Sequence, residues 1–273
     1  MISLLSSLPL WMVAVILNVW MIGFSLICLW LLGRWVLPKL QIGHDDALFY
    51  AAAVMQSAMV LYGLVAALTA VNVWTRHGQA AQTVSREATS IAILWRQLDG
   101  YPPDARDAMH AMLRGYTEQI IGPAWSAQRA GRVPTEGVEL MNRFQQRLFV
   151  FEPSTEAQKI VHGATLAAYD RLIEARRERL DAVKAALPQA MWWVLLPGAM
   201  GCLLLSVFFP VKDVRFHAIL VTALSGFIAM VLFVIVTLDY PFQGPMAIGA
   251  DSYQLVHDQL MGRSADVDGR LSN

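Results

Sequence analysis

The stretch AAAVMQSAMVLYGLVAALTAVN, residues 51–72, decides the fold because it is long, apolar and free of charged side chains. A helix needs about 20 mostly apolar residues to cross a bilayer. We therefore predict a membrane-spanning helix over about residues 47–75, stopped by Arg76. Beyond Arg76, apolar residues recur at steps of three and four: Val84, Ala88, Ile91, Trp95 and Leu98. This spacing predicts that the same helix continues out of the membrane with one apolar face.

Three further stretches have the length and composition of membrane spans, at about residues 10–33, 189–210 and 216–238. The whole chain is 56% hydrophobic and 15% charged, whereas soluble proteins average about 25% charged residues. The first stretch is too long for a signal peptide and no cleavage site follows it, so we expect it to be retained. The sequence predicts an all-α integral membrane protein with four transmembrane helices and a helical extramembrane domain inserted between the second and third.

Most charged residues lie between Arg76 and Lys184, which marks the inserted domain. The predicted domains are a transmembrane hairpin over 1–76, a helical domain over 77–187, a second hairpin over 188–240 and a tail over 241–273. Within the helical domain, Gly122 and Pro123 are expected to end a helix. The last helix of the insert is expected to begin with Ser154 as its cap and to run to Pro188, directly into the third span.

An even number of spans puts both termini and the helical domain on one side of the membrane. Tryptophan and tyrosine residues gather near both ends of the four spans, as they do at membrane interfaces. Basic residues close to span ends are more numerous on the side of the insert, which favours a cytoplasmic helical domain and cytoplasmic termini.

Sequence signals of enzyme chemistry are absent. No ionisable residue lies in the centre of a span, the six histidines are scattered, and neither H-E-x-x-H nor G-x-S-x-G occurs. Cys28 and Cys202 lie in apolar runs with no metal-binding or redox spacing. We therefore expect no enzyme activity, no cofactor and no metal, and the net charge of zero argues against nucleic acid as a partner.

The spans instead contain small and mildly polar side chains. Candidates for a polar pore lining lie along the second span: Gln56, Ser57, Thr69, Asn72 and, at its end, Arg76. Candidates for close helix packing lie in three spans: Gly63, Gly198, Cys202, Ser206 and Gly226. Either group is open to two interpretations, packing within one subunit or contact with a pore or neighbouring subunit. The run RRER, residues 176–179, is interpreted as a solvated helix face, with an anion-attracting vestibule as the alternative.

A box of unusual composition follows the fourth span, formed by Asp239, Tyr240, Pro241, Phe242 and Gly244. A carboxylate at a helix C-terminus is disfavoured by about 0.3–1 kcal/mol. Asp239 should therefore have a cationic partner, such as Arg76, Arg86 or Lys184, or should accept hydrogen bonds from free backbone N–H groups. We interpret the box as a structural clamp between the last span and the helical domain. A short helix should follow it, with Asp251 as its cap and an apolar side formed by Leu255, Val256 and Leu260.

Several stretches together resemble the bacterial bestrophin-like family of four-span membrane proteins. They are SREATSIAILWRQL (85–98), LRGYTEQIIGPAW (113–125), LPQAMWWVLLPGA (187–199) and LDYPFQGPMAIGADSYQLVHDQL (238–260). The resemblance implies an oligomer in the bacterial inner membrane and a distant tie to bestrophins, which are anion channels with cytoplasmic helical domains. The acidic calcium clasp of animal bestrophins is not found here, so calcium gating is not implied.

Two hypotheses follow. The first is a homo-oligomeric channel, anion-leaning, with inorganic anions and the lipid bilayer as its other partners. The alternative is a non-conducting scaffold or sensor whose helical domain binds a partner protein. A central water-lined axis would support the channel, and a monomer or dimer would support the scaffold.

Overall fold

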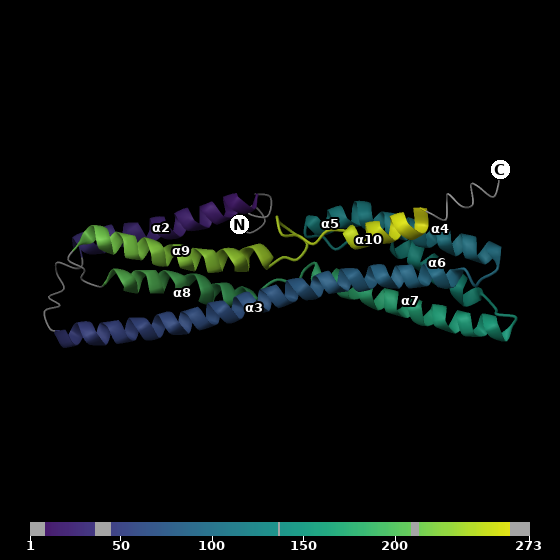
Figure 1. The fold of residues 1–273 in the computed structure, drawn as a ribbon, viewed down its shortest axis with the longest axis horizontal. Coiled ribbons are helices and arrows are strands. Elements are labelled where there is room, and N and C mark those ends of the chain that lie inside the picture. Colours follow the sequence, from purple (N-terminus) through teal and green to yellow (C-terminus); the bar gives the residue numbers. More distant parts are fainter. Residues whose placement is uncertain (1–8, 36–44, 136, 209–212, 263–273) are drawn as a thin grey trace. The chain divides into compact units, whose positions relative to one another are not determined.

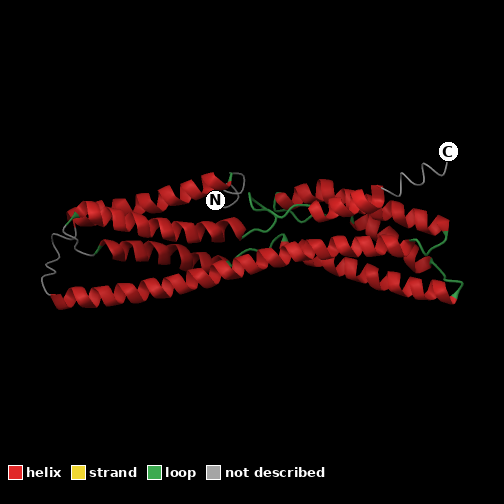
Figure 2. Ribbon diagram, viewed as in Figure 1, coloured by secondary structure: helices red, strands yellow, loops and turns green. Residues whose placement is uncertain are grey.

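The protein is described by a computed structural model over residues 9–35, 45–135, 137–208 and 213–262, with side chains of residues 45–48 not described. All regular structure in these ranges is helical, with no strand among them (Figure 2). Four helices are long and apolar enough to cross a membrane: α2 (Leu10–Trp35), the apolar part of α3 (Asp45–Leu98), α8 (Gln189–Val207) and α9 (Val214–Leu238). The predicted end of the third span at 208–210, and parts of both short loops, fall on or next to residues outside the described ranges.

One compact unit contains the apolar helices and comprises Met1–Arg76, Ala186–Asp239 and Gly244–Met246; we call it the membrane unit. Within it α2 lies along α9, and α8 packs against both (Figure 1). The hydroxyl of Ser225 on α9 donates to that of Ser25 on α2 at 2.8 Å. Both serines are fully buried, so this bond ties two apolar helices where no water can substitute for it.

The second unit, which we call the helical unit, comprises His77–Ala185, Tyr240–Gln243 and Ala247–Asn273. It contains the second half of α3, α4 (Pro103–Gln119), α5 (Trp125–Arg129), α6 (Val138–Val150), α7 (Glu156–Ala182), α10 (Asp251–Val256) and two π-helices, η1 (Ile120–Ala124) and η2 (His257–Met261). The predicted continuation of the helix beyond Arg76 is confirmed, since α3 runs unbroken to Leu98. All five residues of its predicted apolar stripe, from Val84 to Leu98, are at most 4% exposed.

The prediction that Gly122 and Pro123 end a helix is wrong. Pro123 lies inside η1, and the chain stays helical through α5 to Arg129. Proline interrupts the regular hydrogen-bond ladder of an α-helix. Here the wider π turn absorbs the interruption without ending the helix. The turn comes later, where Gly131 takes a φ of +70°.

The predicted limits of the insert's last helix also need correction. Thr155, not Ser154, is the N-cap of α7 and accepts a hydrogen bond from the Gln158 backbone N–H. α7 ends at Ala182, and a non-helical segment separates it from α8, whose N-cap is Pro188. A proline disfavours the helical conformation in the residue before it, which explains why the two helices do not fuse.

Only one face of α7 is buried. Ile160 is 74% exposed, whereas the buried residues are Thr165, Ala168, Tyr169, Leu172, Ala175 and Arg179. Similarly, Asp251 is the first residue of α10 and does not cap it, because Ala250 holds the N-cap position with no side-chain bond. Leu255 points outward at 57% exposure, and Tyr253 and Met261 are the fully buried residues of this segment.

Candidate functional site

The second apolar helix is the least covered of the four. In its most apolar window α3 has 6% of its residues buried, compared with 17% for α2, 33% for α8 and 28% for α9. Gln56, Ser57 and Asn72 all lie on its exposed surface. Between them runs a set of large apolar side chains that are at least 56% exposed: Leu61, Leu64, Leu68 and Val71. We call these exposed residues the α3 face.

The proposed polar lining divides between two sides of α3. Thr69 is 3% exposed and its hydroxyl donates to the Val65 carbonyl at 2.8 Å, so it faces the interior of the membrane unit. Arg76 is half-buried at the end of the unit. The structure therefore brings Gln56, Ser57 and Asn72 to the α3 face and leaves Thr69 off it.

The small residues occupy different surroundings. A Cβ added to Gly198 would lie 2.8 Å from the Tyr62 ring, so α3 approaches α8 closely at this glycine. Cys202 and Ser206 are buried on the same helix. A Cβ on Gly63 would meet nothing within 4 Å, and one on Gly226 only Asn18 Oδ1 at 3.8 Å. Gly63 opens instead into an apolar groove between α3 and α9 that is also lined by Ala67, Phe227 and Val231.

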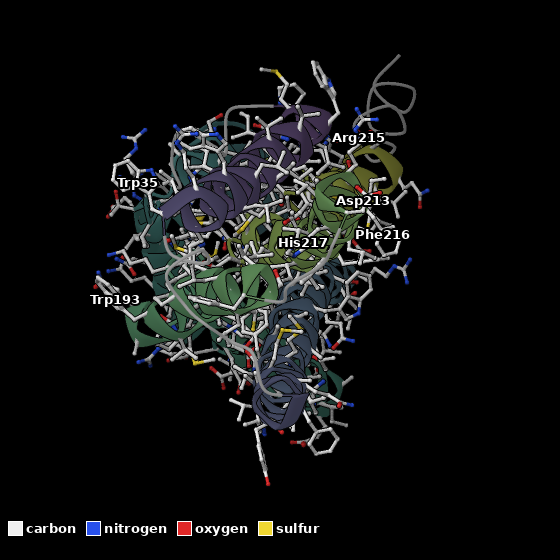
Figure 3. All side chains as sticks on the ribbon, turned by 90° about the vertical axis from the view of Figure 1, so that its left-hand side faces the viewer. Trp35, Trp193, Asp213, Arg215, Phe216 and His217 are labelled. Atoms are coloured by element: carbon white, nitrogen blue, oxygen red, sulfur yellow. The ribbon has the colours of Figure 1, made fainter. Side chains whose placement is uncertain are left out.

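The loop-side ends of the spans can be followed in Figure 3. Trp35 ends α2, is 63% exposed and points away from the helices. Trp193, 72% exposed, also points outward but lies near the start of α8, at the end opposite the loop. Asp213 caps α9 by accepting from the Arg215 and Phe216 backbone N–H groups. His217 is buried and lies 3.1 Å from the Ser206 carbonyl, to which its Nε2 donates.

At the other end of α9, Asp239 is 2% exposed. Its Oδ1 accepts a hydrogen bond of 2.6 Å from the Leu187 backbone N–H, just before α8. Burial raises the pKa of this carboxyl group, and the Leu187 N–H, the charge of Arg76 and the nearby Trp192 indole act in the opposite direction. Arg86, another proposed partner, pairs instead with Glu178 at 2.9 Å.

The residues that follow Asp239 in the box make contacts different from those of Asp239. The Pro241 carbonyl accepts from the Ile248 N–H at 2.9 Å. Phe242 is 2% exposed and meets Trp125 edge to face at 5.7 Å within the helical unit. Gly244 has a φ of +84°, a conformation that favours glycine, and Tyr240 is half-buried.

The core of the helical unit contains a buried ion pair that was not predicted from the sequence. Arg179 Nε donates to Glu87 Oε2 at 2.6 Å, and the two side chains are 2% and 0% exposed. Tyr116 and Tyr253 donate to the two Glu87 oxygens at 2.7 and 2.9 Å. Arg179 Nη1 donates to Gln128 Oε1 at 2.7 Å. Glu87 thus connects α3, α4, α7 and α10 in one network.

This network corrects the interpretation of residues 176–179 as a solvated face, since Arg179 is 1% exposed. Burial raises the pKa of the Tyr116 and Tyr253 phenols well above the usual value, and the Glu87 charge adds to the effect. A signal was present in the sequence. Glu87 follows Val84 by three positions and precedes Ile91 by four, so it lies on the apolar stripe of α3.

A family model and several solved structures match the chain. A family model described as a Bestrophin-like domain matches residues 10–253. A leucine-to-threonine variant of a bacterial bestrophin homologue from Klebsiella pneumoniae has a similar structure, with a TM-score of 0.69, 13% identity, and coverage of 90% of this chain and 98% of that chain. An isoleucine-to-threonine variant of that homologue has a TM-score of 0.69 and 13% identity, with coverage of 91% of this chain and 99% of that chain.

A crystallised membrane protein with a proline-to-alanine substitution gives a TM-score of 0.68, at 13% identity and with 90% and 97% coverage. No curated protein sequence matches the chain. At these identities the structural matches show the fold, and the family match covers most of the chain.

Proposed function

We propose, from the premise that this chain belongs to the bestrophin-like family, that it forms a homo-oligomeric, anion-leaning ion channel in the bacterial inner membrane. The family consists of channels, not enzymes. The single observation that carries the proposal is the α3 face. It is the most exposed surface of any apolar helix here and bears Gln56, Ser57 and Asn72.

The leucines and the valine of the α3 face suit lipid, but the exposed amides of Gln56 and Asn72 do not. An amide side chain without a hydrogen-bond partner costs about 1–3 kcal/mol in an apolar environment, from mutational data on proteins. Helices α2, α8 and α9 already pack against one another, so α3 is the helix left to face a neighbour or water. In a ring of subunits, α3 helices around a central water-filled axis would solvate these amides.

The proposed preference for anions rests on charge. Between Asp46 and Glu87 α3 has no acidic residue, and its charged residues in that interval are Arg76 and Arg86. Arg86 is paired with Glu178, whereas Arg76, whose charge also acts on Asp239, would supply positive potential near the end of the apolar stretch. Rings of charged or polar side chains select ions in channels, and a basic ring favours anions.

The proposal includes the topology and orientation expected from the sequence. The four apolar helices would each cross the membrane, with the helical unit inserted between the second and third spans. The helical unit and both termini would be cytoplasmic, because basic residues flank the spans on that side. Thiol labelling of single cysteines in inverted and right-side-out vesicles would give the orientation.

The test is conduction by purified protein. We expect the solubilised protein to have a mass several times the protomer's 30.3 kDa. In planar bilayers under a KCl gradient, the reversal potential should shift towards the Nernst potential of chloride. A well-folded oligomer that shows no conductance over a range of pH and calcium concentrations would contradict the proposal. A monomer or dimer would favour the alternative of a non-conducting scaffold.

A further inference from the structure

Asp239 is the residue after which the chain leaves the membrane unit at the end of α9. The chain leaves the membrane unit after Arg76, enters it again at Ala186 and leaves it after Asp239. Three groups that act on the Asp239 carboxyl lie in this unit: the carboxyl's own helix end, the Leu187 N–H and the charge of Arg76. Within the membrane unit, the carboxyl group is therefore affected by residues next to all three of these points of the chain.

The surroundings of the two carboxyl oxygens differ. Oδ1 accepts the 2.6 Å bond from Leu187 N. Oδ2 is buried and accepts no hydrogen bond from the residues that the structure describes. Trp192 lies near enough to favour the charged form but does not form a hydrogen bond to Oδ2. A buried carboxylate oxygen without a donor is costly while it is charged.

Two helix ends act on the same group in opposite directions. The C-terminus of α9 disfavours a negative charge at Asp239, and the N-terminal end of α8, where the chain donates through Leu187, favours one. The charged and polar groups of neighbouring elements that act on the carboxyl are Arg76 from α3 and Trp192 from α8. Neutralising the carboxyl by adding a proton at Oδ2 would remove the uncompensated charge and leave the Oδ1 bond to Leu187 in place.

We propose that Asp239 is a proton-binding site, and that its protonation at Oδ2 makes the junction of α3, α8 and α9 at the edge of the membrane unit responsive to pH. The proton comes from solvent and no other group is consumed. If the channel function holds, this site would make conductance depend on pH, but proton binding itself can be measured without conduction.

The direction of the effect follows from linkage. Burial raises the folded-state pKa of Asp239 above the ordinary value of 3.8. The stabilising contribution is therefore fully present below the unfolded pKa and is lost as pH rises through the folded pKa. Mild acidification should stabilise the wild type relative to Asp239→Asn, which is neutral at every pH.

Infrared spectroscopy of the reconstituted protein tests the proposal directly. On acidification the band of a protonated carboxylic acid should appear at a higher pH than for exposed acids, and this component should be lost in Asp239→Asn. Asp213→Asn is the matched control: Asp213 also accepts backbone N–H bonds at an end of α9, but it is exposed. Its removal should leave the component intact.

A second variant keeps the test decisive if Asp239→Asn does not fold. Arg76→Gln removes a charge that favours the ionised carboxyl, so the midpoint of the component should shift to higher pH. The proposal is overturned if the part of the carboxylic-acid band that appears at higher pH persists in Asp239→Asn, or if it titrates together with the exposed acids. An Arg76→Gln midpoint that does not move would also overturn it.

Discussion

Replacement of Glu87 by glutamine should destabilise the helical unit more than any other single change of charge described here. The substitution keeps the size of the side chain but leaves Arg179, 1% exposed, without its counter-charge. It also places an amide NH₂ among groups that already donate, namely Arg179 and two tyrosine hydroxyls. Removing one partner of a buried pair costs about 3–5 kcal/mol.

Thermal unfolding of the purified protein, followed by circular dichroism, measures this loss. For a unit of this size about 1 kcal/mol shifts Tm by roughly 2–4 °C, so Glu87→Gln should lower Tm by about 6–20 °C. The matched control is Glu178→Gln, which breaks the Arg86–Glu178 pair between side chains that are 62% and 42% exposed. Exposed pairs contribute about 0–1 kcal/mol, so the control should change Tm by only a few degrees.

Coupling is also expected between Glu87 and Arg179. Once Arg179 is replaced by methionine, Glu87→Gln should cost clearly less than it does alone, since the charge that it stranded is gone. Equal Tm shifts in Glu87→Gln and Glu178→Gln, or strictly additive effects of the two buried substitutions, would refute the argument from burial.

Two further predictions concern packing and alkaline pH. Gly198→Ala should destabilise the membrane unit by about 1–3 kcal/mol, because its Cβ would lie 2.8 Å from a tyrosine ring, while Gly201→Ala, with nothing within 4 Å, should be neutral in thermal unfolding. The raised pKa values of the phenols beside Glu87 imply a contribution to stability that is fully present below pH 10.0 and is lost as pH rises through the folded-state pKa values. In a pH series of Tm measurements, Tyr253→Phe should lose less stability at alkaline pH than the wild type.

Helix periodicity was sufficient to predict the broad architecture. The apolar runs predicted all four long apolar helices, and the three-and-four spacing from Val84 to Leu98 predicted that α3 continues beyond Arg76. Gln56 and Asn72 are both exposed although their spacing of 16 residues puts them about 160° apart around the helix, so spacing did not predict which polar residues of α3 are exposed and which, like Thr69, are buried. Which side of a helix is buried depends on how the neighbouring helices pack against it. That packing cannot be predicted from the sequence of one helix alone.

The predictions that were wrong or lacking have local or long-range physical causes. Gly122 and Pro123 are typical of a helix end, and whether a π turn absorbs the proline depends on the packing around it. Ser154 and Thr155 are both good caps, and the backbone bond from Gln158 selects Thr155. The partner of Arg179 lies 92 positions away, so only the three-dimensional fold shows that this charge is buried.

The central claim, that the α3 face lines an ion pathway, is tested most directly by thiol block of conductance in planar bilayers. The background should lack Cys28 and Cys202, and cysteine should replace either Asn72, which is exposed, or its neighbour Val73, which is 1% exposed. The account predicts that a water-soluble, bulky thiol reagent blocks the current through Asn72→Cys and leaves Val73→Cys unchanged. Equal block of both variants, or an unchanged current through a labelled Asn72→Cys channel, would contradict it.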